Sequence, residues 1–217
     1  MELNFFQLLK QLFLILWVFI IFSFISSCTL LNVNLLPTVS PLKEKKVYGE
    51  GNVKVLLVDI QGAISTGSSR SPLGTLVETG MPAKIREILE KAEEDEEIKA
   101  LILRINSPGG TVTASDIIFH ELKEFKKRKK IKIYAIIMDL AASGGYYVAM
   151  AADKIIAHPT SITGSIGVIA LKPTIGGLLD KIGIGVDVVK SVDKKDFMAP
   201  WRPFTKEERR LFQETID

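Results

Sequence analysis

The sequence has few of the residues that build most metal and redox sites. It contains one cysteine and two histidines among 217 residues. A single cysteine excludes an intrachain disulfide and a metal site built on cysteines. A phosphate-binding loop of the Gly-x4-Gly-Lys type is also missing, which argues against ATP use. The function must therefore be sought in the motifs that are present.

Excess charge of one sign is also lacking. The formal net charge is +3, which is too small to indicate a nucleic-acid partner, and the sequence contains no RNA- or DNA-binding motif. A basic cluster covers residues 126–130. It falls at the end of a predicted helix, where positive charge favours the helix dipole. We expect no nucleic-acid binding.

A long apolar stretch near the N-terminus predicts a membrane segment. Residues 12–22 are apolar without interruption, and residues 5–31 carry Lys10 as their only charge. This length suffices for the roughly 20 residues that cross a bilayer. An uncleaved anchor and a cleaved export signal both fit. Cys28 ends an Ile-Ser-Ser-Cys sequence that looks like a bacterial lipobox. Cys28 is therefore either the attachment site of a lipid anchor or a small residue near the end of a membrane helix.

The composition divides the chain into three parts. We predict a membrane anchor or signal segment over residues 1–31, a linker over 32–52 that is rich in Pro, Ser, Lys and Gly, and a domain over 53–217. The basic residue before the apolar run favours a cytoplasmic N-terminus. We therefore expect a single-pass protein of the cell membrane whose domain lies outside the cytoplasm.

Strand and helix patterns alternate along the domain. Apolar runs at residues 54–60, 100–105, 133–138 and 154–157 predict strands. Residues 82–92 predict a helix, and a capping box at Thr113 and Asp116 predicts the start of another. Residues 61–80 predict a loop that gates substrate. This order predicts an α/β domain with a largely parallel sheet, but periodicity does not select one α/β fold.

A serine lies between the third strand and the helix predicted over residues 144–152. The sequence Ala-Ala-Ser-Gly-Gly-Tyr-Tyr covers residues 141–147, with Ser143 at its centre. A hydroxyl at this junction lies at the positive end of the helix dipole, beside N–H groups that lack helical partners. Ser143 is therefore a candidate nucleophile. The alternative is a helix cap or a tight turn.

A second turn follows the strand at residues 100–105. Asn-Ser-Pro-Gly-Gly covers residues 106–110. Consecutive glycines allow Gly109 and Gly110 to approach a substrate and to direct an N–H group at a developing oxyanion. The alternative is an ordinary strand-to-helix turn.

Together these motifs resemble signal peptide peptidase A, a family of membrane-anchored serine proteases with the Clp-protease/crotonase fold. The resemblance starts near Val53 and continues through Ala-Asp-Lys-Ile at 152–155, Thr-Gly-Ser-Ile-Gly-Val at 163–168 and Lys-Ser with Lys-Asp between 190 and 196. It implies the spiral α/β fold of that family. It also implies a serine endopeptidase acting on cleaved signal peptides and similar peptides from the membrane.

The predicted site has several candidates for the general base. His158 is one candidate, and Lys190, Lys194 and Lys195 are others if burial lowers the lysine pKa toward neutrality. The residues alone do not rank the three lysines. The resemblance places the base at Lys195. It also implies that Ser165 hydrogen-bonds and orients this lysine, with a turn cap as the alternative.

The mechanism implied by the resemblance needs no cofactor. Lys195 takes the proton of Ser143, and the N–H groups of Gly110 and Gly144 hold the oxyanion. We expect an extended peptide to add to a strand edge near Gly109 and Gly110. The family forms ring-like homo-oligomers in which serine and lysine from neighbouring subunits meet.

Two departures from the family pattern are mild, namely Val192 in place of glycine and Ala199 in place of serine. A third is that the family continues beyond position 217, so we expect the chain to lack the further segment that the family has there. Two other functions therefore stay open. One is a catalytically silent relative that serves as a scaffold or partner of an intact peptidase. The other is a crotonase-type acyl-CoA enzyme, which tight binding of a CoA thioester would reveal.

Overall fold

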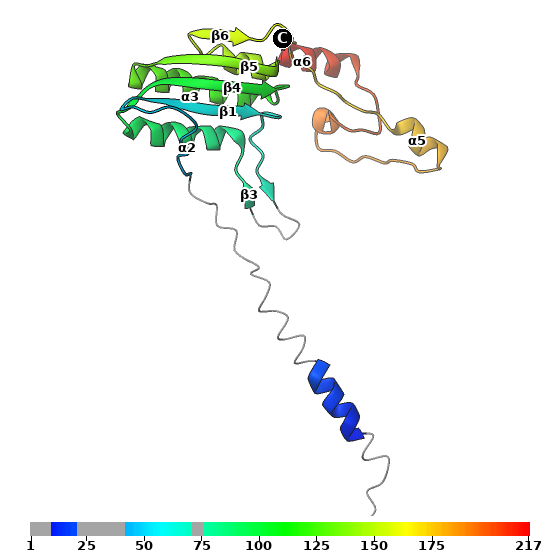
Figure 1. Ribbon diagram of the computed structural model, residues 1–217. Helices are drawn as coiled ribbons and strands as arrows, with labels where there is room; N and C mark the ends of the chain where they lie inside the picture. The colour runs from blue at the N-terminus through cyan, green and yellow to red at the C-terminus, as the bar shows by residue number, and fades with distance from the viewer. Residues whose placement is uncertain (1–9, 21–41, 71–75) are drawn as a thin grey trace, which may run out of the picture. The chain divides into compact units, whose positions relative to one another are not determined.

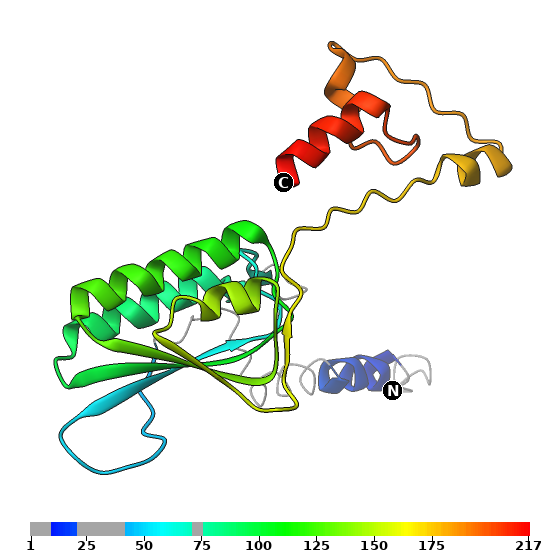
Figure 2. The ribbon, with the colours of Figure 1, turned by 90° about the horizontal axis from the view of Figure 1, so that it is seen from above.

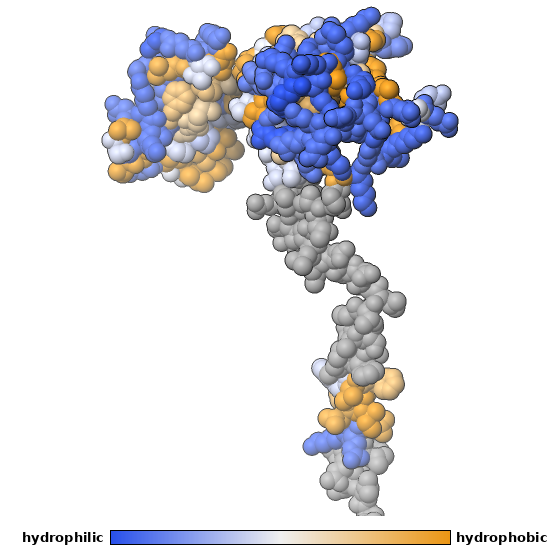
Figure 3. All heavy atoms as spheres, turned by 90° about the vertical axis from the view of Figure 1, so that its left-hand side faces the viewer, coloured by the Kyte–Doolittle hydropathy of each residue, from blue (hydrophilic) through white to orange (hydrophobic). Residues whose placement is uncertain are grey.

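The computed structural model describes residues 10–20, 42–70 and 76–217. Residues 10–20 form a helix whose apolar side chains are exposed, and they include the orange spheres between the grey ones in Figure 3. No helix within the described ranges combines the length and apolar character that crossing a membrane requires. The rest of the predicted membrane segment, Cys28 included, and the first part of the predicted linker lie outside the described residues.

A parallel sheet forms the centre of the unit that comprises residues 43–67 and 79–217. Its strands are β1 (Lys54–Gln61), β4 (Ile98–Ser107), β5 (Lys132–Ala142) and β6 (Lys154–Ala157), in the order β1-β4-β5-β6, and β7 (Ile162–Gly164) also pairs with β5 (Figure 1). Every pairing in this sheet is parallel. The predicted α/β class with a parallel sheet is confirmed.

Strand β5 is longer than the predicted residues 133–138, because it continues to Ala142. Its first half pairs with β6, and its last residues pair with β7, where Ala142 lies opposite Gly164. Small and polar residues in this last part gave no apolar run to recognise. Pairing with β7 fixes the end of β5 directly before Ser143.

Two helices cover one face of the sheet, as both views show (Figures 1 and 2). Helix α2 (Met81–Glu94) has a proline in its first turn, and its buried residues recur with helical spacing. Helix α3 (Val112–Lys129) buries Ile118, Leu122 and Phe125 completely. These side chains join the aliphatic residues of β1, β4 and β5 in one core.

The start of α3 corrects one prediction. The capping residue is Thr111, whose hydroxyl accepts the N–H of Ala114 at 3.4 Å, and not Thr113. Thr111 has extended backbone angles because the turn at Gly109 and Gly110 ends there, whereas Thr113 is already helical. The helix therefore begins closer to the glycine turn than the sequence suggested.

Residues 61–80, predicted as a loop, contain a short hairpin of β2 (Ser69–Arg70) and β3 (Leu76–Glu78). Before the hairpin, Ile64 forms an isolated parallel bridge with Gly110. This bridge connects the loop to the glycine turn.

After β5 the chain forms α4 (Gly144–Ala149), which is shorter than the predicted residues 144–152. Beyond β7 come α5 (Gly176–Lys181), the one-turn 3-10 helix η1 (Asp193–Asp196) and α6 (Lys206–Ile216). A capping box between Thr205 and Glu208 starts α6. We call residues 171–217 the C-terminal segment.

Candidate active site

Ser143 lies on a strained turn between β5 and α4. Its backbone angles are φ +50° and ψ −122°, in a region that residues with a Cβ rarely adopt. Such a conformation costs on the order of 1–3 kcal/mol and persists where neighbours fix it. Here the Ser143 N–H donates to the Gly164 carbonyl at 2.8 Å, and its own carbonyl accepts the Tyr147 N–H at 3.0 Å. The half-buried hydroxyl makes no hydrogen bond within the described part of the chain.

Gly109 packs directly against this turn. Its φ is +91°, and a Cβ at this position would lie 2.6 Å from the Gly144 nitrogen and 2.9 Å from Cβ of Ser143. Only glycine therefore fits. The Gly109 N–H donates to Oγ of the fully buried Ser107 at 3.1 Å, and the same hydroxyl donates to the Gly62 carbonyl at 2.7 Å.

Ile64 fixes the orientation of the next peptide group. The Ile64 N–H donates to the Gly109 carbonyl, and the Thr111 N–H donates to the Ile64 carbonyl, both at 2.9 Å. In a trans peptide the C=O and N–H groups point in opposite directions. The Gly110 N–H, which shares its peptide with the Gly109 carbonyl, therefore points away from Ile64.

Two N–H groups beside Ser143 are left without partners. Among the described residues neither Gly110 nor Gly144 donates its N–H to another group, and a Cβ on Gly144 would lie 3.3 Å from the Gly110 nitrogen. Gly144 is the first residue of α4 and so has no helical acceptor. Fixed backbone donors next to a hydroxyl form the arrangement that stabilises an oxyanion in acyl transfer.

Both polar backbone groups of Gly109 are already bonded, to Ser107 and to Ile64. A peptide added at this turn therefore cannot accept from the Gly109 N–H without breaking its bond to Ser107, although the Gly109 carbonyl has a second lone pair. The predicted peptide edge at Gly109 and Gly110 stays a prediction. In the structure the role of Gly109 is to let the turn approach Ser143.

Ser165 follows the residue that holds Ser143. It has a positive φ of 52° and is exposed, and Gly164 before it accepts the Ser143 N–H. Within the described residues the Ser165 hydroxyl has no hydrogen bond, including none to a lysine. The structure therefore brings Ser165 near Ser143 through the backbone, while its predicted contact with Lys195 is not present.

The three candidate lysines differ in their contacts. Lys190 forms an ion pair with Asp196 at 2.8 Å, and Lys194 forms one with Glu207 at 2.7 Å. Lys195 lies exposed in η1, and in the described chain its amine has no hydrogen bond or ion pair. No such contact connects it with Ser143.

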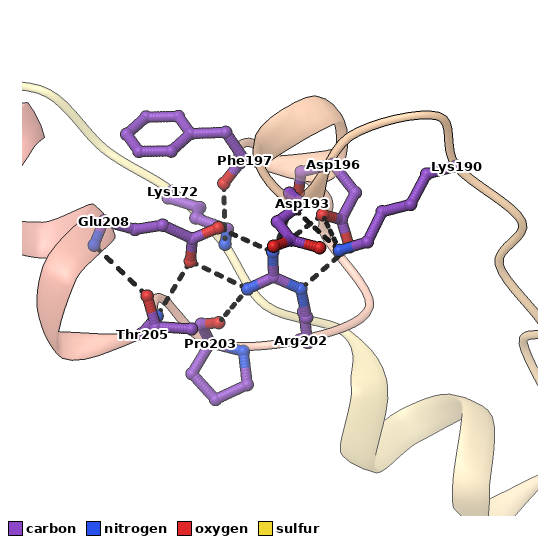
Figure 4. Close-up of polar contacts among 9 residues, drawn as sticks. All are labelled: Lys172, Lys190, Asp193, Asp196, Phe197, Arg202, Pro203, Thr205 and Glu208. Atoms are coloured by element: carbon purple, nitrogen blue, oxygen red, sulfur yellow. Dashed lines mark hydrogen bonds and ion pairs between the residues drawn. The ribbon is translucent and has the colours of Figure 1, made fainter.

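A cluster of ion pairs between side chains, here called the ion cluster, holds the residues around Lys195 (Figure 4). Arg202 contacts Asp196 at 3.0 Å and Glu208 at 2.7 Å, and both carboxylates are nearly buried. The Arg202 guanidinium and the Thr205 N–H lower the pKa of Glu208 to about 2. Hydrogen bonds from Arg202 and Lys190 likewise hold the pKa of Asp196 far below its ordinary value. The cluster fixes η1 to the start of α6.

The histidines have other contacts. His158, the rival base, is exposed and bonds through Nδ1 to Oγ1 of Thr160 at 2.8 Å. His120 lies on α3 and contacts Asp116. Neither bonds to Ser143. The described residues contain no group of three or more His, Cys, Asp or Glu that could hold a metal ion.

Sequence analysis missed two residues that shape this site, Ile64 and Ser107. Ile64 acts through its backbone, so its side chain carries no signal. Ser107 lies within the Asn-Ser-Pro-Gly-Gly motif. Its position between a strand and a proline could have indicated a hydroxyl that holds the turn.

The fold and the turn first define a class: an α/β domain with a parallel sheet, whose serine at a strand-to-helix junction lies beside backbone donors, as in serine hydrolases. Residues 125–217 match peptidase family S49, and residues 68–163 match the Clp protease family. The resemblance to signal peptide peptidase A is thereby confirmed, and the chain is related to the serine-type proteases of family S49.

Two relatives illustrate the match. A putative protease of Synechocystis sp. is 36% identical over 164 residues, which cover 76% of this chain and 53% of the relative. The chloroplastic serine protease SPPA of Arabidopsis thaliana is 34% identical over 166 residues, covering 76% of this chain and 24% of the relative. The chain thus spans about half or less of the length of these relatives.

A solved structure, a variant of the 1510-N membrane-bound stomatin-specific protease, is 20% identical with a TM-score of 0.43. That match covers 55% of this chain and 51% of the other.

Proposed function

We propose that this protein is a serine endopeptidase with Ser143 as nucleophile and Lys195 as general base. The observation that supports it most is the strained Ser143 turn beside the unpaired N–H groups of Gly110 and Gly144. A serine that served only as a helix cap would accept a helical N–H, and the Ser143 hydroxyl does not.

In this mechanism the neutral amine of Lys195 takes the proton of the Ser143 hydroxyl as its oxygen attacks the peptide carbonyl. The N–H groups of Gly110 and Gly144 stabilise the negative charge on the former carbonyl oxygen. The lysine then gives its proton to the leaving amine, and the C–N bond breaks. Water then attacks the acyl-enzyme and loses a proton to the lysine, which passes that proton to the Ser143 oxygen as the ester C–O bond breaks and the carboxylic acid product leaves.

Lys195 is preferred over its neighbours because Lys190 and Lys194 are already paired with carboxylates. A paired ammonium is held in its charged form, whereas a base must be neutral. Lys195 is exposed in the single chain, and its amine contacts no other polar group among the described residues. We propose that a neighbouring subunit in a homo-oligomer covers this amine, bringing its Ser143 to Lys195, with Ser165 orienting the amine.

The proposed substrates are peptides from the membrane, chiefly cleaved signal peptides, and the chemistry needs no cofactor. We propose that the apolar N-terminal segment tethers the protein to the cell membrane with its domain outside the cytoplasm. The exposed apolar side chains of the helix at residues 10–20 support this tether.

The test is cleavage of a fluorogenic peptide by the full-length chain, purified in detergent. Ser143→Ala and Lys195→Ala should each abolish cleavage. Lys194→Ala is the matched control, since it removes the adjacent amine and should leave most of the activity. His158→Ala should also remain active, and loss of activity in that variant alone would replace the Ser/Lys pair by a serine-histidine one.

A second candidate function rests on the lack of a contact between Lys195 and Ser143 in the described chain. The protein would then be a silent relative that acts as a scaffold or partner of an intact peptidase. An acylating phosphonate probe distinguishes the two functions. If the probe labels the wild type and Ser143→Ala abolishes the labelling, the silent relative is excluded. If the folded wild type neither cleaves peptides nor reacts with the probe, the silent relative is supported.

A further inference from the structure

A side-chain hydrogen bond connects the two helices that follow the proposed oxyanion donors. The Tyr147 hydroxyl donates to Oδ1 of Asp116 at 2.8 Å, and this bond raises the pKa of Tyr147. Tyr147 lies in the first turn of α4, where its N–H bonds to the Ser143 carbonyl. Asp116 lies near the start of α3. The bond therefore lies close to both donors.

Each donor is at the N-terminal end of one of these helices. Gly110 directly precedes Thr111, the capping residue of α3, and Gly144 is the first residue of α4. The two ends are in close contact, because a side chain at Gly144 would collide with the Ser115 hydroxyl of α3. A shift of α4 against α3 thus changes the separation of the two N–H groups. Oxyanion stabilisation needs both donors within about 2.7–3.1 Å of one oxygen.

Helix α4 has little stability of its own. It covers only Gly144–Ala149, begins with two glycines and has no side-chain cap. Helices this short depend on tertiary contacts. The contacts of Tyr147 are its bond to Asp116 and the packing of its ring against Phe119, with centroids 4.9 Å apart. Phenylalanine at 147 would keep the ring and lose only the hydrogen bond.

We propose that Tyr147 and Asp116 are positioning residues that hold the Gly144 N–H at the correct distance from the Gly110 N–H. The inference rests on the proposed function, since the two donors matter only if Ser143 performs acyl transfer. Neither side chain touches the reacting atoms. Their effect should therefore fall on the rate of acylation and not on substrate binding.

The chain offers a matched control in the adjacent residue. Tyr146 packs against the core, and its hydroxyl makes no hydrogen bond among the described residues. In peptide cleavage by the full-length chain, Tyr147→Phe should lower kcat between about tenfold and a hundredfold while KM changes less than about twofold, because a small misplacement of catalytic groups affects the chemical step. Tyr146→Phe should leave both unchanged. Equal kinetics for the two variants would overturn the proposal.

Variants at Asp116 test the same bond from its other side. Asp116→Ala should lower kcat at least as far as Tyr147→Phe, since it also removes the contact of Asp116 with His120, and the double variant should be no worse than Asp116→Ala alone, because the bond to Tyr147 is already lost there. Asp116→Asn keeps an acceptor oxygen and should retain most of the activity. Additive losses in the double variant, or an Asn variant as poor as the Ala variant, would contradict positioning through this bond.

Amide hydrogen exchange separates failure of this inference from failure of the proposed function. Tyr147→Phe should speed exchange of the amides of α4 relative to Tyr146→Phe, whether or not the protein cleaves peptides. If wild type neither cleaves nor labels at Ser143, the proposed function fails, and exchange still decides whether the bond holds α4. Unchanged exchange in Tyr147→Phe would overturn the inference even in an active enzyme.

Discussion

The sheet region, which extends from β1 to β7 (residues 54–164), carries Ser143, and the C-terminal segment carries Lys195. The two regions are stabilised in different ways. The sheet region has a core of buried, mostly aliphatic side chains from the strands β1, β4 and β5 and the helices α2, α3 and α4. The C-terminal segment has the Arg202 ion cluster and three contacting phenylalanines, Phe197, Phe204 and Phe212. Figure 3 shows a largely hydrophilic surface on the sheet region and apolar patches on the C-terminal segment.

The surroundings of Ser143 and Lys195, the two residues of the proposed site, reflect this difference. The Ser143 N–H donates to the Gly164 carbonyl, and the adjacent Gly109 is held by hydrogen bonds with Ile64 and Ser107, so the turn that carries the proposed nucleophile is fixed within one chain. Lys195 lies on the one-turn helix η1, which is held by ion pairs between side chains, and the amine of Lys195 is exposed. The turn at Ser143 is thus held by contacts within one chain, whereas the amine of Lys195 makes no polar contact among the described residues.

The largest expected effect is loss of the sheet core. Phe125→Ala removes a fully buried ring and should lower the free energy of unfolding by about 3–5 kcal/mol. Phe212→Ala, in the half-buried aromatic group of the C-terminal segment, should cost clearly less. Urea denaturation followed by circular dichroism measures both. Equal losses would mean that the two regions share one core.

The next largest effect should come from Ser107. Ser107→Ala leaves the buried Gly109 N–H without its acceptor and the Gly62 carbonyl without its donor. This should lower the free energy of unfolding by about 1–3 kcal/mol and reduce peptide cleavage. Ser115→Ala is the control, because the equally buried Ser115 hydroxyl bonds only to the Thr111 carbonyl of its own helix. A greater loss in Ser115→Ala would argue against Ser107 as the group that holds the turn.

Removal of Arg202 should act locally. Arg202→Met leaves the nearly buried carboxylate of Glu208 without its cation and leaves Asp196 with Lys190 alone, so we expect faster proteolysis between η1 and α6 while the sheet region melts as before. Arg210→Met removes a guanidinium whose exposed ion pair with Glu214 lies within one helix, and it should have no measurable effect. A global loss of stability in Arg202→Met would contradict the separation of the two regions.

The smallest effect should appear on acidification. The pKa of Glu208 is lowered from 4.5 to about 2, so its contribution to stability is complete above pH 4.5 and is lost as the pH falls toward 2. Trp201 fluorescence in a Trp17→Phe variant reports on the C-terminal segment alone, since the chain has two tryptophans. In Glu208→Gln the change between pH 4.5 and 2 should be much smaller. An identical titration in that variant would assign the transition to other carboxyl groups.

Much of the sheet region could be predicted because its signals are local. Apolar runs located β1, β4, β5 and β6, and the consecutive glycines at 109 and 110 indicated a close backbone approach. The end of β5, the capping role of Thr111 and the bridge from Ile64 could not be predicted in this way. The end of β5 and the bridge from Ile64 depend on a partner strand or turn that is distant in the sequence, and neither requires a particular side chain there, whereas the cap at Thr111 depends on where the glycine turn ends.

The sequence by itself determined the α/β class, the serine between strand and helix, and the family resemblance, because these depend on residue types at fixed spacing along one stretch of chain. Only the tertiary structure decided that the Gly110 nitrogen lies near Gly144 with neither N–H bonded to another described residue, and that Tyr147 is bonded to Asp116. The physical reason is that hydrogen-bond partners across helices and strands follow from packing, which fixes distances that local patterns do not contain.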